Sequence, residues 1–153
     1  MAHYARAIQR PSLIHHPDRA ETRGIVIHWT AGHKAGDLAA LDGPNVDCHF
    51  YVDRTGEVFE FLDSDSQAWH AFHTANHTCL GIEHEGSGEA WTPKQLEASA
   101  QLVAWLSRLY NIPVVKSTRT RTGTESSGTA TCRESTGTTT PIRFPPTSAG
   151  TGT

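Results

Sequence analysis

The composition of the chain changes abruptly near Lys116, and this change limits how much of the chain can build a core. Residues 117–153 contain 13 threonines, 5 serines and 5 glycines, but only 5 hydrophobic residues. Such a segment buries too little apolar surface to offset the conformational entropy that is lost when a chain becomes ordered. We therefore expect a folded part within residues 1–116 and a disordered tail over 117–153. A Thr-rich linker at a domain end would have the same composition.

The length of 153 residues fits one domain, and the charge excludes some classes of partner. A net charge of -3 gives no basic surface for nucleic acid. No apolar run approaches the ~18 residues of a membrane span. Residues 1–19 form a polar arm without the apolar region of a signal peptide. We expect a monomer that neither binds nucleic acid nor enters a membrane, and the three cysteines do not indicate a disulfide framework.

Short apolar, β-branched runs predict strands at 24–29, 48–53, 57–62, 79–84 and 112–115. The turn Arg54-Thr55-Gly56 separates two of these runs, so 48–53 and 57–62 should form a β-hairpin. Strands that alternate with helices predict an α/β fold, with a central mixed β-sheet flanked by helices.

The longest predicted helix covers residues 93–110. Thr92 is suited to the N-cap and Pro93 to the first helical position, while Gln95 completes a capping box. Apolar side chains at helical spacing give this helix one buried face: Leu96, Val103, Leu106 and Tyr110. A shorter helix is predicted over 34–41.

All ten histidines lie between His3 and His84, and His28 is the one best placed for chemistry. It ends the predicted strand 24–29, and α/β folds bind ligands at the carboxyl ends of their strands. Neutral imidazole is also a common zinc ligand. The alternative is a core histidine whose nitrogens bond to the backbone.

Glu83 lies near the end of another apolar strand. Partial burial there would raise the pKa of its carboxyl group and suit it to general acid–base catalysis. Glu85 lies two residues further on and would share its face, so the two carboxylates could instead form a solvated edge.

The pair Trp69-His70 follows a polar loop and could line a substrate groove or anchor the loop on the core. His49 lies within a predicted strand, where Cys48 faces the opposite side. Three further histidines lack the spacing of metal ligands and are expected at the surface: His73, His77 and His84.

Four motifs, taken in order and spacing, resemble the type 2 N-acetylmuramoyl-L-alanine amidases, which include phage endolysins and the related peptidoglycan recognition proteins. The resemblance covers residues 20–116. It is carried by Ile25-Val26-Ile27-His28-Trp29-Thr30-Ala31-Gly32, Cys48-His49-Phe50-Tyr51-Val52-Asp53-Arg54-Thr55-Gly56, Ala68-Trp69-His70-Ala71 and Leu80-Gly81-Ile82-Glu83.

The resemblance implies a zinc groove on one face of the sheet and a bacterial peptidoglycan substrate. The implied reaction is hydrolysis of the amide between N-acetylmuramic acid and L-alanine of the stem peptide. His28 matches the first Zn²⁺ ligand, and Glu83 matches a carboxylate that acts on the zinc-bound water. Trp29, Trp69 and His70 match the substrate groove. A phage endolysin of this kind would reside in the host cytoplasm before lysis.

The chain departs from the family pattern after residue 116. The family takes its second histidine and a third ligand, Asp or Cys, from a segment that reads like Gly-His-Arg-Asp-Val and ends in Asp-Pro-Gly. Residues 117–153 contain no His and no Asp, so Cys132 is the only residue there of a type that the family uses as a zinc ligand. The remaining readings are an impaired amidase, a non-catalytic peptidoglycan-binding module, or a structural fragment.

A shift of reading frame near Ser117 would explain this departure. Read one base early, codons for residues 129–134 can encode His-Arg-His-Val-Pro-Gly, and those for Thr140-Pro141 can encode Asp-Pro. The alternative is the native Thr-rich linker.

Overall fold

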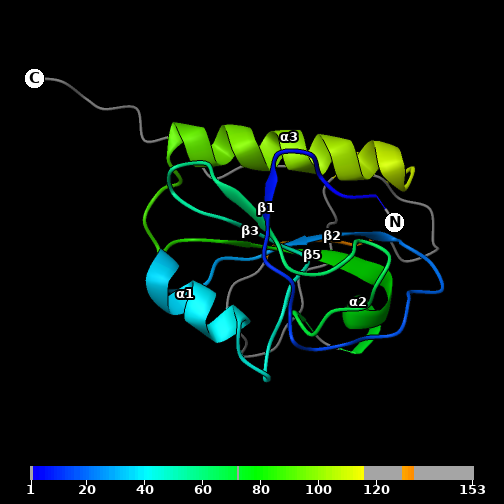
Figure 1. Ribbon diagram of the computed structural model, residues 1–153. Coiled ribbons are helices and arrows are strands. Elements are labelled where there is room, and N and C mark those ends of the chain that lie inside the picture. Colours follow the sequence, from blue (N-terminus) through cyan, green and yellow to red (C-terminus); the bar gives the residue numbers. More distant parts are fainter. Residues whose placement is uncertain (1, 72, 116–128, 133–153) are drawn as a thin grey trace, which may run out of the picture.

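A computed structural model describes residues 2–71, 73–115 and 129–132 of the chain. In this part, six strands form one mixed sheet with helices on both faces (Figure 1). The strands are β1 Ala7–Gln9, β2 Gly24–Ile27, β3 Phe50–Val52, β4 Val58–Glu60, β5 Cys79–His84 and β6 Thr129–Cys132. The helices are α1 Lys34–Leu41, α2 His73–Thr78 and α3 Pro93–Leu109. The predicted α/β class, with a central mixed sheet flanked by helices, is confirmed.

The strand order across the sheet is β1-β4-β3-β5-β2-β6. The central strand β5 runs parallel to both of its neighbours, β3 and β2. The predicted hairpin is confirmed as the antiparallel pair β3 and β4. Its turn needs Gly56, which has a φ of 88° and lies against the backbone of Lys94.

Helix α3 covers one face of the sheet and closes the larger core, in which Leu102 and Leu106 pack against the strands. The helix begins at Pro93 with Thr92 as its N-cap, as predicted, because the Thr92 hydroxyl accepts a hydrogen bond from the Gln95 N–H at 3.1 Å. The predicted capping box does not form, because the Gln95 side chain is buried and its Nε2 donates instead to the carbonyls of Val52 and Glu85. It ends with Asn111 at a φ of 52° and with the Ile112 N–H bonded to the Ser107 carbonyl.

The opposite face carries α1 and α2, which lie on the other side of the sheet from α3 in Figure 1. A second apolar cluster lies on this face beneath α1, composed of Leu41, Cys48, Tyr51, Phe59 and Phe61. Leu38 and Leu41 of α1 pack against Tyr51 and Phe59 in this cluster, and α2 contacts β5.

The strand predicted at 112–115 is wrong. Pro113 has no N–H to offer a sheet, and its carbonyl instead accepts from the Val115 N–H in a tight turn at 2.9 Å. Three elements that the sequence did not predict are β1, α2 and β6, all short.

The N-terminal arm and the tail both contribute strands to the sheet. Within residues 1–19, β1 pairs with β4 in parallel. Within 117–153, β6 pairs with β2 antiparallel, and the other residues of the tail lie outside the described part. No helix among the described residues is long and apolar enough to span a membrane.

Candidate active site

His28 and Glu83 are neighbours on the sheet face that carries α1 and α2. The parallel register pairs Ile27 with Ile82, and both pack toward α3. The His28 N–H continues this ladder to the Ile82 carbonyl at 2.9 Å. The next pair, His28 and Glu83, therefore lies side by side on the opposite face, on strands about 4.8 Å apart.

The imidazole of His70 lies over the backbone of β5 and meets His28. A Cβ added to Gly81 would approach His70 Cγ to 2.4 Å, so only glycine leaves room for this ring. His28 Nε2 lies 3.0 Å from His70 Nδ1, and His70 Nε2 lies 3.3 Å from the Cys79 carbonyl. His70 Nε2–H donates to this carbonyl, which leaves Nδ1 with a lone pair that faces His28.

Both imidazoles are neutral at neutral pH. Burial lowers the pKa of His28 to about 4. Burial, and secondarily the neighbouring His28, lower the pKa of His70 to about 3. Neutral imidazole nitrogens with an oriented second nitrogen are the form in which histidine binds metal ions.

Glu83 is the carboxylate available for chemistry. Burial, followed by the charge of Asp37, raises its pKa to about 7, and its Oε2 is buried without a hydrogen-bond partner in the part of the chain that the structure describes. Asp37 itself is held by the hydroxyls of Thr30 at 2.7 Å and Tyr51 at 3.0 Å.

Glu85 has a structural role instead. Its two carboxylate oxygens accept from the backbone N–H groups of Lys34 and Arg54, both at 2.9 Å. The two carboxylates thus do not form one solvated edge.

His49 is fully buried and has no nitrogen free for a ligand. Its Nδ1 accepts from the Gly81 N–H at 2.9 Å, so Nε2 carries the proton and donates to the Ser66 carbonyl at 2.8 Å. Burial, with the Arg19 guanidinium beside the ring, holds the pKa of His49 well below its usual range.

The prediction that His84 lies at the surface is wrong. It is fully buried, stacks on Trp91 at 4.2 Å between ring centroids, and bonds to the His28 carbonyl and the Ser99 hydroxyl. His77 is exposed as predicted, and the side chain of His73 lies outside the described part.

The two tryptophans predicted to line the groove differ in exposure. Trp69 adjoins His70 in the chain and is 53% exposed. Trp29 follows His28 and is half-buried, with its ring against Gly88.

The chain is similar in sequence and fold to known proteins. The sequence profile of the N-acetylmuramoyl-L-alanine amidases (Amidase_2) matches residues 18–135. The chain belongs to this amidase family. No curated protein matches it.

Solved structures of amidases share the fold. An AmpD derivative aligns with a TM-score of 0.57 at 22% identity, covering 71% of this chain and 77% of that one. The endolysin LysCS from Clostridium intestinale URNW aligns at 0.57 and 22%, covering 72% and 78%. A peptidoglycan recognition protein solved in complex with tracheal cytotoxin aligns at 0.58 and 16%, covering 71% and 78%. The family match supports an N-acetylmuramoyl-L-alanine amidase class of function, and the solved structures show that the fold is shared.

The donors near His28 fit zinc in kind but not in number. Imidazole nitrogen is a preferred zinc ligand, and His28 and His70 place two such nitrogens together. Among the described residues, however, no group of three His, Cys, Asp or Glu side chains could hold a metal ion. Cys48 is a free thiol, fully buried, that donates to the Phe50 carbonyl.

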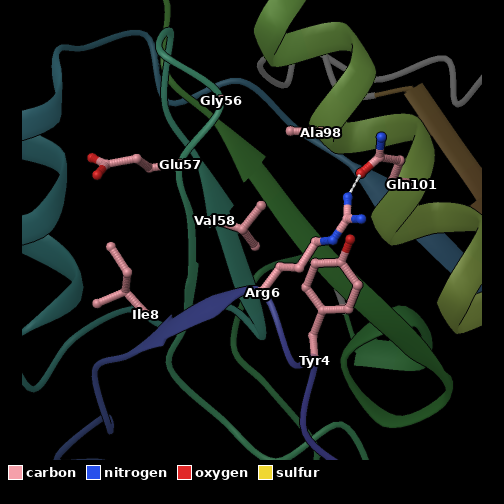
Figure 2. A pocket seen from close by; sticks show the side chains of 8 residues that line it. All are labelled: Tyr4, Arg6, Ile8, Gly56, Glu57, Val58, Ala98 and Gln101. Carbon is pink, nitrogen blue, oxygen red and sulfur yellow. Dashed lines mark hydrogen bonds between the residues drawn. The ribbon is translucent and has the colours of Figure 1, made fainter.

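A separate hollow of about 380 Å³ lies between β1, β4 and α3 (Figure 2). Arg6 and Gln101 are hydrogen-bonded across it. It lies at the β1 edge of the sheet, where β4, β3 and β5 separate β1 from β2, so it is distinct from the region of His28 and Glu83.

Four residues of the site region were missed from the sequence: His16, Asp37, Asp47 and Tyr51. Asp37 lies in the first turn of a predicted helix, where an acidic residue ordinarily faces solvent, whereas here it is buried. Tyr51 pairs with Glu83 across the sheet, so both side chains lie on the same face. The alternation of side chains along the strand was the only feature of the sequence that could have indicated this.

Proposed function

We propose that the chain is a peptidoglycan amidase domain that hydrolyses the amide between N-acetylmuramic acid and L-alanine. The observation that carries the proposal is the pairing of His28 with Glu83 on one face of the sheet, with a buried Glu83 oxygen that no described group satisfies. Structural groups in this region, such as Glu85 and His49, have their polar atoms satisfied.

In this proposal His28, which matches the family's first zinc ligand, would hold Zn²⁺. Zinc, when bound, supplies a Lewis acid that polarises the amide carbonyl and makes water acidic near neutral pH. His70 Nδ1 lies 3.0 Å from His28 Nε2 and is the nearest described nitrogen that could share the ion. The remaining donors would come from residues outside the described part.

Glu83 then acts as the general base and acid. With a pKa near 7, its carboxyl group exchanges a proton with water and with an amine leaving group at small cost in either direction. Burial is the main cause of this raised pKa, and the negative charge of Asp37 adds to it. The Asp37 carboxylate is held in place by the hydroxyls of Thr30 and Tyr51. Trp29, Trp69 and His70 would contact the substrate on either side.

A second candidate is a peptidoglycan-binding module without catalysis. The shortage of metal donors among the described residues favours it. A binding module needs the groove but neither a complete zinc site nor Glu83.

One experiment separates the two candidates. Purified cell walls are incubated with the full chain, with and without chelator, while turbidity and cosedimentation are measured. The amidase predicts clearing that chelator and Glu83→Gln both abolish; the binding module predicts cosedimentation without clearing. A chain that neither clears nor cosediments would rule out both functions.

A further inference from the structure

We propose that Asp47, paired with His16 of the N-terminal arm, positions Trp69 as a stacking surface for the sugar ring of peptidoglycan. This inference rests on the proposed function and adds the part of the substrate that Trp69 meets.

Asp47 uses both carboxylate oxygens to hold two different segments. Its Oδ1 accepts from the backbone N–H of Trp69 at 2.6 Å, and its Oδ2 lies 2.6 Å from His16 Nε2. The side chain of Asp47 is 0% exposed and that of His16 is 4% exposed. A buried carboxylate is costly unless it is paired and hydrogen-bonded, and here each oxygen has its own donor.

The backbone around Trp69 is held from the other side as well. The N–H groups of His70 and Ala71 donate to Asn76 Oδ1, at 3.1 and 2.7 Å. Asp47 and Asn76 therefore hold three consecutive N–H groups, and the segment that carries Trp69 and His70 is fixed in position.

The indole of Trp69 is the group that this arrangement presents. It is 53% exposed, although its backbone is tied down, and its ring meets the ring of His16 nearly edge-on at 4.9 Å. A rigid, exposed aromatic ring offers a large apolar contact at low entropic cost.

The N-terminal arm that carries His16 is fixed to the loop over residues 64–66 by hydrogen bonds of Arg19. The Arg19 guanidinium donates to the carbonyls of Ser64 and Ser66, and the Arg19 N–H donates to the Asp65 carbonyl. His16 precedes residue 18, where the match to the family begins.

The position of Trp69 indicates which part of peptidoglycan it would contact. His70, its neighbour, lies at the His28 nitrogen where the scissile amide would bind. The N-acetylmuramic acid ring adjoins that amide and has flat faces of C–H groups that pack on an indole. We therefore assign the sugar ring to Trp69, rather than the acidic stem peptide.

The test measures binding to the full chain, with chelator present so that no hydrolysis occurs. Two ligands are titrated: N-acetylmuramoyl-L-alanyl-D-isoglutamine, and L-alanyl-D-isoglutamine, which lacks the sugar. The wild type should bind the sugar-bearing ligand about fivefold more tightly, as expected for one aromatic contact. Trp69→Ala should abolish this preference.

The variants at Asp47 and His16 then test positioning. Asp47→Leu and His16→Phe keep the branching or the planar ring of the side chain but remove the hydrogen bonds, and should lose the preference for the sugar. Asp47→Asn can still accept from the Trp69 N–H and bond to His16 in its other tautomer, and should retain it. Thermal unfolding of each variant checks that it folds, and His16→Phe serves if Asp47→Leu does not.

The outcomes are distinct. An unchanged preference in folded Asp47→Leu or His16→Phe would overturn the positioning role and leave the proposed function intact. Equal wild-type affinity for both ligands would overturn the sugar assignment alone. If the wild type bound neither ligand nor cell walls, both the inference and the proposed function would fail.

Discussion

His70 Nδ1 lies 3.0 Å from His28 Nε2, although 42 residues separate the two histidines in the chain. The contact exists because Gly81 has no side chain, and because the Cys79 carbonyl fixes the His70 ring in one tautomer. It brings a residue of a loop to the residue that follows a central strand.

Gly81→Ala should destabilise the protein and displace His70. The new methyl group would lie 2.4 Å from His70 Cγ, so the ring must move, at a cost of about 1–3 kcal/mol. Gly36→Ala is the matched control, because nothing lies within 4 Å of the new Cβ in α1 and the helix should gain about 1 kcal/mol. Denaturant unfolding measures both, and equal free energies of unfolding for the two variants would contradict the packing of His70 on Gly81.

Zinc affinity should depend on the sequence after Lys116. A site with fewer than three protein donors competes poorly with water for zinc, so the present chain should bind Zn²⁺ weakly. A protein translated from the alternative reading frame after Lys116 should bind Zn²⁺ tightly and have amidase activity. His28→Ala should abolish zinc binding in both forms. Calorimetric titration with Zn²⁺ measures the affinity, and equal affinity in the two forms would place the ligands elsewhere, with His70 the first candidate.

In the form that binds zinc tightly, the catalytic rate should fall at low pH, because a protonated Glu83 cannot act as the general base. Because the pKa of Glu83 is raised to about 7, the acid side of the pH–rate profile should be governed by a group near that value. Asp37→Asn removes a negative charge that raises this pKa, so the acid limb should move to lower pH. A limb that stays in place in Asp37→Asn would show that another group limits the rate.

The protein should lose stability as the pH falls below about 6.5, and His49 should account for part of the loss. Its pKa is lowered in the folded state, so the unfolded chain binds more protons and stability rises with pH across this range. At pH 5 the loss from one such histidine is about 2 kcal/mol.

His49→Gln provides the control for this pH dependence. Glutamine can accept from the Gly81 N–H and donate to the Ser66 carbonyl without titrating. The free energy of unfolding, measured from pH 7.5 to 5, should therefore fall less steeply in this variant. Parallel curves for the two proteins would exclude His49 as a source.

The elements of the fold that were predicted from sequence are those encoded locally. The hairpin of β3 and β4 follows from alternation around a glycine turn, and α3 from Thr92, Pro93 and the termination at Asn111. Local signals failed where partners are distant. β1 has only three residues and pairs with β4, about 50 positions away, and the apolar residues 112–115 pair with no strand in the part of the chain that the structure describes.

For the site, the sequence by itself determined which residues were candidates, and tertiary structure decided what each one faces. His28 and Glu83 stand out because a polar group at the end of an apolar strand is a local anomaly. The residues nearby do not separate Glu83 from Glu85, or His70 from His49 and His84, since these side chains differ in which groups of other segments meet them in the folded chain. Hydrogen bonds between segments 30 to 60 residues apart form only when the sheet is assembled. They leave Glu83 unsatisfied and bring His70 to His28, and neither outcome is encoded in the residues nearby.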